Sequence, residues 1–352
     1  MRARCAFVAA VGAVASLMSL TAAVAQPPAP VSSVSVAVRA ATPAHPRGSY
    51  FAPLVVISWT GEDPTANGVV VCLTRGTAPS TDPTYCDVRR DVPAPAVHTN
   101  PIQLRAGASF AIAVFAYTGG SSREYSAPVN TIQDGSALHG KGPYYLAYGD
   151  SVRLSGHLID VNSKAALVGQ PVRLLYLPPG SDSTHLVTTV TTDAQGAVGH
   201  AFRARASGDY FWVFNGVDGH LSTSMQMTLI VAERVTGHLS SSRAAPGQQI
   251  QIYGTITPAR ASGTQTVRLL EQQTSGPCRG VYQLQSEHTT AKRQRLPNGQ
   301  TTYGYVMTVS RTAPGAHKLE AYADGDKQLG GASSPSLTLT VTGATAAYAA
   351  RC

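Results

Sequence analysis

The residues most suggestive of catalysis are Gly149-Asp150-Ser151, where a glycine and an aspartate directly precede a serine. Asp182 and His185 follow and would supply the carboxylate and the imidazole that a serine nucleophile requires. Such a serine normally sits on a strand-to-helix turn, which exposes its hydroxyl beside oxyanion donors. The alternating apolar residues after Ser151 predict a strand instead, so we expect no catalytic residue in this segment.

Metal ligation is the other chemistry that the side chains could support. Carboxylates occur at Asp218 and in Asp324-Gly325-Asp326, but the adjacent glycines are typical of hairpin turns. Several histidines lack the spacing of a zinc-binding helix or finger and are interpreted as surface residues: His139, His157, His185, His200 and His220. We therefore expect no metal site and no cofactor.

The cysteines point to disulfide chemistry in an oxidising compartment. Cys5 lies in a segment that we expect to be removed, which leaves an even number of cysteines in the mature chain. Four cysteines allow three connectivities, and proximity within one predicted domain favours Cys72 with Cys86 and Cys278 with Cys352. Closing the shorter loop, of about 15 residues, would contribute roughly 3 kcal/mol.

The N-terminal segment predicts export. Residues 1–25 resemble a secretory signal peptide, with two early arginines, an uncharged apolar run and the small-residue cleavage site Ala23-Val24-Ala25. A transmembrane anchor is the alternative, but a proline-rich linker at 26–33 follows at once. No later segment approaches the ~20 consecutive apolar residues that span a bilayer. We expect a secreted, extracellular protein without a membrane span.

Composition and patterning predict an all-β fold. The chain has 352 residues, of which 43% are hydrophobic and only 13% charged, which excludes coiled coils and wholesale disorder. The net charge of +8 comes from scattered arginines, apart from the basic stretch 292–295, so we expect no nucleic-acid partner. Short alternating apolar runs, separated by Gly, Pro, Asn and Asp, predict three tandem antiparallel β-sandwiches of about 100 residues each.

The first unit, residues 34–134, carries two segments with a family likeness. Residues 56–59 resemble the second strand of a fibronectin type III domain, and residues 104–117 resemble its corner and sixth strand. The resemblance implies that Trp59 is a core tryptophan. Phe110 stands where that family usually has the corner tyrosine, and we expect it in the core as well.

The second and third units, residues 138–232 and 233–343, are copies of one another. Residues 148–158 match residues 246–256, and later strands match in the same order. A repeat of about 100 residues is a whole domain rather than a solenoid unit. The pattern resembles the bacterial Ig-like repeats of secreted surface proteins, which implies two further sandwiches, followed by a C-terminal tail at 344–352.

The densest aromatic segment of the chain surrounds Trp212, which we expect in the core. Its neighbours Phe211 and Val213 align in the repeat with Lys318 and Glu320, which indicates that both face outward. They would line an interface with a neighbouring domain, or form a patch that binds sugar or protein. Phe211, Trp212 and Val213 are therefore the candidate binding residues.

A duplicated strand-only module without a catalytic constellation favours binding over turnover. We expect a non-catalytic, monomeric, secreted or cell-surface rod, which serves adhesion or recognition of an extracellular polysaccharide or a surface protein. A secreted hydrolase, or an accessory module of one, with a site not recognisable from sequence is the alternative. A sandwich fold by itself does not decide between them, because it hosts unrelated activities.

Overall fold

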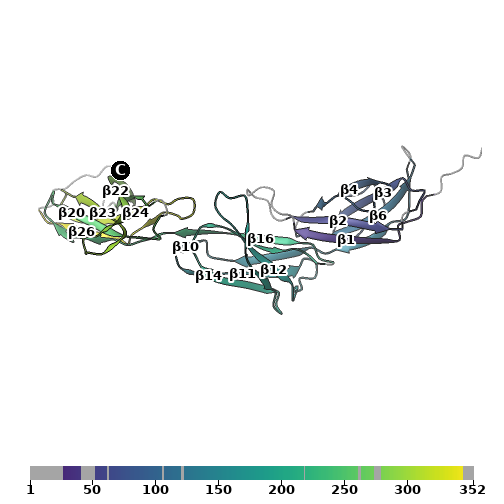
Figure 1. Ribbon diagram of the computed structural model, residues 1–352, viewed down its shortest axis with the longest axis horizontal. Helices are drawn as coiled ribbons and strands as arrows, with labels where there is room; N and C mark the ends of the chain where they lie inside the picture. The colour runs from purple at the N-terminus through teal and green to yellow at the C-terminus, as the bar shows by residue number, and fades with distance from the viewer. Residues whose placement is uncertain are drawn as a thin grey trace, which may run out of the picture.

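The protein consists of three β-sandwiches that lie end to end in chain order (Figure 1). The computed structural model describes residues 27–40, 52–61, 63–104, 107–119, 123–217, 219–260, 263–272 and 279–343. Within these ranges every regular element is a strand, and no helix suited to crossing a membrane occurs there. The predicted all-β fold of tandem antiparallel sandwiches is confirmed.

The first sandwich has one sheet of order β1-β2-β5 and a second of order β4-β3-β6-β7, in which β8 also pairs with β6. Its core includes Trp59 and Phe110, because alternate residues of each strand point inward. The bounds are β1 (Ser33–Ala40), β2 (Pro53–Thr60), β3 (Gly68–Arg75), β4 (Val88–Pro93), β5 (Ile102–Gln103), β6 (Phe110–Thr118), β7 (Glu124–Tyr125) and β8 (Val129–Gln133).

The second sandwich has sheets of order β14-β11-β9 and β10-β16-β15-β12-β13. Strand β10 pairs in parallel with β16, and all other pairs are antiparallel. Trp212 lies at the centre of its core. The bounds are β9 (Ser136–Lys141), β10 (Tyr145–Ala147), β11 (Ser151–Asp160), β12 (Pro171–Leu177), β13 (His185–Thr191), β14 (Ala197–Arg203), β15 (Gly208–Phe214) and β16 (Thr223–Ala232).

The third sandwich is one continuous sheet of order β17-β20-β23-β22-β21-β24-β26-β19. Its two halves are joined by the long β22, which pairs with β21 over most of its length and with β23 at its end. The bounds are β17 (Arg234–Val235), β18 (His238–Leu239), β19 (Arg243–Ala244), β20 (Gln249–Thr257), β21 (Gln265–Gln272), β22 (Tyr282–Arg295), β23 (Thr301–Ser310), β24 (Gly315–Ala323), β25 (Ala332–Ser333) and β26 (Leu337–Val341).

The sequence repeat corresponds to a repeat of strand pairing. Strand β11 pairs with β14 as β20 pairs with β23, and β12 pairs with β15 as β21 pairs with β24. A short strand also pairs in parallel with the last strand of each unit, β10 with β16 and β19 with β26. The loop after β15 and the loop after β24 therefore occupy the same place in the two sandwiches.

Candidate functional site

The catalytic-looking string opens a strand. Gly149 has φ of +86°, a left-handed conformation suited to a tight turn. The carboxylate of Asp150 accepts a hydrogen bond from the Ala147 N–H at 2.9 Å and pairs with Arg234. Ser151 is exposed at the start of β11, and among the described residues its hydroxyl has no hydrogen-bond partner. This arrangement builds a turn and supplies no base to activate the serine.

The candidate binding residues on β15 are buried on both faces of the strand. Trp212 and Val213 are 0% exposed and Phe211 is 6% exposed. Phe211 and Val213 form a separate apolar cluster with Leu175 and Leu177 of the adjacent β12. Phe211 and Val213 lie on the face of β15 opposite the Trp212 core, but this face is buried, so they form no exposed binding patch. None of the three offers an accessible face to a ligand.

Exposed aromatic side chains lie elsewhere in the second sandwich. Tyr144 and Tyr145, at the start of β10, are 55% and 67% exposed. Their rings meet edge to face, with centroids 4.9 Å apart. Sequence reasoning missed this pair of tyrosines. The available signal was its position directly after Gly142-Pro143, a dipeptide typical of turns.

A hollow of about 510 Å³ lies between residues 177–182 and 207–209 of the same sandwich. It is lined in part by Asp182, the carboxylate considered above for a catalytic triad.

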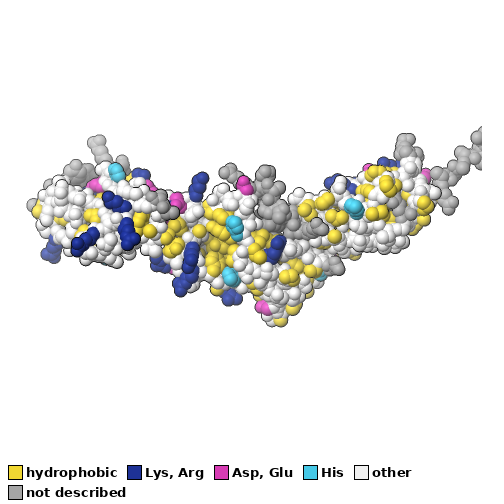
Figure 2. Space-filling view, in the orientation of Figure 1, with side chains coloured by type: hydrophobic (Ala, Val, Ile, Leu, Met, Phe, Trp, Pro, Cys, Tyr) yellow, Lys and Arg dark blue, Asp and Glu magenta, His cyan; other side chains and the backbone are white. Residues whose placement is uncertain are grey.

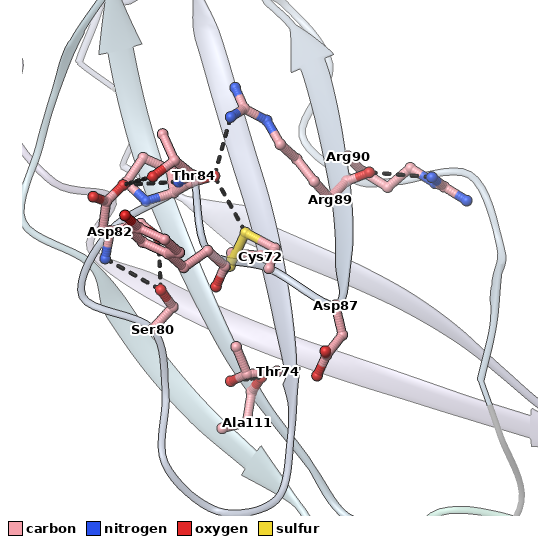
Figure 3. Close-up of a disulfide and its surroundings, with 12 residues drawn as sticks. Cys72, Thr74, Ser80, Asp82, Thr84, Asp87, Arg89, Arg90 and Ala111 are labelled. Atoms are coloured by element: carbon pink, nitrogen blue, oxygen red, sulfur yellow. Dashed lines mark hydrogen bonds between the residues drawn. A yellow bond between two sulfur atoms is a disulfide. The ribbon is translucent and has the colours of Figure 1, made fainter.

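One disulfide joins Cys72 of β3 to Cys86 in the loop before β4, with their Cα atoms 5.2 Å apart (Figure 3). The loop is further held by Arg89, which donates a hydrogen bond to the Pro83 carbonyl at 3.0 Å. The disulfide agrees with the pairing of Cys72 with Cys86 that the sequence favoured. The expected partners Cys278 and Cys352 lie outside the described residues, and so does Asp218.

Basic side chains are spread singly over the face of the second and third sandwiches that Figure 2 shows. They do not gather there in one stripe along the molecule.

At the first junction, residues 215–217 and 219–222, between β15 and β16, contact the first sandwich. Leu221 of this loop is 1% exposed and belongs to the core of the first sandwich. The Asp134 N–H donates to the Gly219 carbonyl at 2.8 Å, and the Leu221 N–H donates to the Asp134 carbonyl at 2.8 Å. The two sandwiches thus share a hydrophobic core residue and a short parallel bridge.

Close backbone approach also marks the first junction. Gly216 has φ of +87°, and a Cβ atom there would lie 2.7 Å from Val38 Cγ1 of the first sandwich. A Cβ atom on Gly135 would lie 2.6 Å from the backbone carbon of Ala108. Both positions require glycine, because any side chain would push the two sandwiches apart.

The second junction uses residues 324–331, the equivalent loop of the third sandwich. Leu329 is 6% exposed and belongs to the core of the second sandwich. The Gly330 N–H donates to the Val231 carbonyl at 2.9 Å, and the Ser207 N–H donates to the Gln328 carbonyl at 2.7 Å. A parallel bridge forms here too, between Gly330 and the end of β16.

A buried ion pair closes the second junction. The Glu233 side chain is 0% exposed, and its Oε1 lies 2.7 Å from Arg260 Nε. Arg260 also pairs with Asp326 of the loop, and Gln265 donates to the other oxygen of Glu233. Burial raises the pKa of Glu233, while the hydrogen bond from Gln265 and the charge of Arg260 act in the opposite direction. Arg260 thus binds one carboxylate from the linker between the sandwiches and one from the loop after β24.

Sequence reasoning missed both leucines, since each stands in a turn-rich segment without any period of 2. A weak signal was available: in both repeats an Asp-Gly turn after the aromatic or apolar strand is followed by a leucine and then by the last strands. The two leucines thus link each sandwich to the core of the one before it.

No protein-family model and no curated protein matches the chain. Among solved structures it is similar to the FN1–FN3 domains of chicken CNTN1, with 10% identity and a TM-score of 0.24 over 90% of this chain and 99% of that one. It is also similar to the three N-terminal domains of the highly immunogenic outer capsid protein (Hoc) of bacteriophage RB49. That match has 12% identity and a TM-score of 0.26 over 88% of this chain and 99% of that one. Scores this low say nothing about function.

Proposed function

We propose that this protein is a non-catalytic extracellular rod, whose three sandwiches act as one stiff body that holds binding surfaces at a set distance. The observation that carries the proposal is the pair Leu221 and Leu329, each of which lies in the core of the preceding sandwich. Tandem domains move relative to one another unless their interface is large and hydrophobic. A shared core residue opposes such motion, because bending the junction would expose that residue to water.

The extracellular location is supported by the disulfide and by the N-terminal segment. A bond between Cys72 and Cys86 persists in oxidising compartments and is rare in the cytosol. Residues 1–25 resemble a signal peptide. Fractionation of the native organism tests this: we expect the protein outside the cytoplasm with Cys72 and Cys86 oxidised. Cytoplasmic protein with free thiols at these positions would contradict the proposal.

Recognition of an extracellular polysaccharide or a surface protein is the proposed use of the rod. Tyr144 and Tyr145 are its best candidate contacts, since exposed tyrosine rings stack on sugars and supply contact area at little entropic cost. We expect Tyr144→Ala with Tyr145→Ala to abolish retention on envelope polysaccharide or surface protein of the native organism. Tyr85→Ala is the matched control, because Tyr85 is 75% exposed on the first sandwich. Equal retention by the double variant would exclude these rings.

The stiffness of the rod is tested by small-angle X-ray scattering on the full chain. We expect one extended conformation to fit the scattering of the wild type. The combined Leu221→Ala and Leu329→Ala variant should instead require an ensemble of bent shapes. A wild-type profile that already requires such an ensemble would contradict the proposal.

A further inference from the structure

The first junction gathers three side chains that could ligate a metal. Asp134 follows β8, Asp160 ends β11, and His220 lies in the loop before β16. One ligand atom from each lies within 4.8 Å of the other two. They come from both sides of the junction, so a shared ion would tie the first sandwich to the second.

Asp160 presents a buried oxygen to this cluster. Its side chain is only 8% exposed. Oδ1 accepts hydrogen bonds from the N–H and the hydroxyl of Ser163, at 2.6 and 2.8 Å, and from the Asn162 N–H at 3.0 Å. Oδ2 accepts none from the described residues and lies 3.3 Å from His220 Nε2. A buried carboxylate oxygen without a donor is costly unless a cation faces it.

Asn162 connects the two carboxylates of the cluster, since its N–H donates to Asp160 Oδ1 at 3.0 Å. Asp134 is positioned as well, because Asn162 Nδ2 donates to its Oδ1 at 2.7 Å. The same Asn162 amide donates to Ser109 Oγ of the first sandwich at 2.8 Å, which fixes the cluster to both domains.

At the second junction an arginine neutralises the carboxylates, whereas the first junction has no such basic partner among the described residues. At the second junction Glu233, from the linker, and Asp326, from the loop, are both paired with Arg260. At the first junction no Lys or Arg in the described part of the chain pairs with Asp134 or Asp160. Two carboxylates thus meet at the equivalent place without the cation that neutralises them in the other repeat.

We infer that Asp134, Asp160 and His220 bind a divalent cation, Zn²⁺, at the first junction. An imidazole with two carboxylates suits zinc, whereas Ca²⁺ takes six to eight oxygen ligands. Tetrahedral ligands at the usual 2.0–2.1 Å lie roughly 3.3 Å apart. His220 Nε2 and Asp160 Oδ2 already have that separation of 3.3 Å. Asp134, whose ligand atom lies within 4.8 Å of those of the other two, would supply the third protein ligand, with water as the fourth.

The experiment is titration of the metal-free full chain with ZnCl₂ by calorimetry. We expect one equivalent to bind at the junction, and His220→Gln and Asp134→Asn each to weaken binding at least tenfold. Asp160 is left intact, since its Oδ1 holds the loop at Ser163. The matched control is His139→Gln with His157→Gln, an exposed cross-strand pair of β9 and β11 that could take up zinc adventitiously.

A second readout is the zinc-induced rise in melting temperature, expected in the wild type and in the control but lost in His220→Gln. Absence of zinc binding would overturn the inference and leave Asp160 and His220 as an ion pair. Binding unchanged in His220→Gln, or lost only in the control, would overturn it as well. None of these results touches the buried leucines, so the failure of the metal site and the failure of the rod are distinguishable.

Discussion

The two junctions share a backbone design and differ in their charges. Each uses the same loop of a repeat to place a leucine in the preceding core and to form a short parallel bridge. At the second junction Arg260 neutralises the carboxylates, whereas the first has two carboxylates and an imidazole. The comparison shows that the position of the loop in the repeat determines the contact between two sandwiches. The side chains near each loop determine how the buried charges at that junction are balanced.

The largest effect is expected when the second junction loses its cation. Arg260→Met leaves the buried Glu233 carboxylate unpaired, which should cost about 3–5 kcal/mol of unfolding free energy at neutral pH. Because burial already raises the pKa of Glu233, the variant should regain stability as the pH falls and the group protonates, and lose it as the pH rises. Urea unfolding at several pH values measures both effects.

The control for that variant is Arg268→Met, because Arg268 pairs with Asp324 at the surface of the same sandwich. An exposed pair of this kind contributes at most about 1 kcal/mol. If Arg260→Met were no more damaging than Arg268→Met, the buried ion pair would not be what closes the second junction.

Truncation of Leu221 or Leu329 should destabilise the sandwich whose core receives the leucine, not the sandwich whose loop carries it. Leu329→Ala should cost the second sandwich about 2–5 kcal/mol, and Leu221→Ala should cost the first a similar amount. Trp212 and Trp59, one in each receiving core, report the two losses separately by fluorescence.

Leu284→Ala is the control for both truncations, since Leu284 is 55% exposed on β22. We expect it to change stability by less than about 0.5 kcal/mol. A loss confined to the sandwich that carries the leucine would contradict shared cores.

The close approach at the first junction predicts a smaller effect. Gly216→Ala should cost about 1–3 kcal/mol more than Gly219→Ala, as both glycines have positive φ but only the former faces Val38. Chemical denaturation followed at Trp59 measures the difference. Equal costs would show that the backbone conformation, and not the contact between sandwiches, requires the glycine.

The smallest effect lies away from both junctions. His317 Nδ1 faces Glu271 Oε1 at 2.7 Å and its Nε2 faces the Ala313 carbonyl at 2.8 Å, and two acceptors favour the imidazolium, which has two N–H donors. The hydrogen bond to Glu271 raises the pKa of His317 above 6.5, against the effect of burial. This stabilisation, about 1 kcal/mol, is fully present below pH 6.5 and is lost as the pH rises through the raised value.

The melting temperature of the third sandwich should therefore depend less on pH, between pH 5 and 9, in His317→Gln than in the wild type. His238→Gln, which changes an exposed histidine of β18, should keep the pH dependence of the wild type. A wild-type stability independent of pH would contradict the assignment.

Strand patterns were predictable where local alternation decides burial. Val55, Ile57 and Trp59 occupy alternate positions of β2 and are buried in the first core, whereas Val56 and Ser58 between them are half-buried. Phe211 and Val213 lie on the face of β15 that points away from the Trp212 core, yet they are buried there as well. Whether an apolar face is exposed depends on what packs on it, and no local period carries that information.

The junctions left only a weak signal in the sequence, for a different reason. A leucine in a turn has no periodicity, so nothing in the sequence assigns Leu329 to the core of another domain. Asp134, Asp160 and His220 come from three distant segments, and their meeting depends on the stacking of the sandwiches. Motif spacing detects ligands only when they share one local element.

The most direct test of the rod is a set of N–H residual dipolar couplings measured on the full chain in weak alignment. If the buried leucines join the three sandwiches into one stiff body, a single alignment tensor fits the couplings of all of them. Three tensors of different magnitude would show sandwiches that reorient independently and would contradict the central claim.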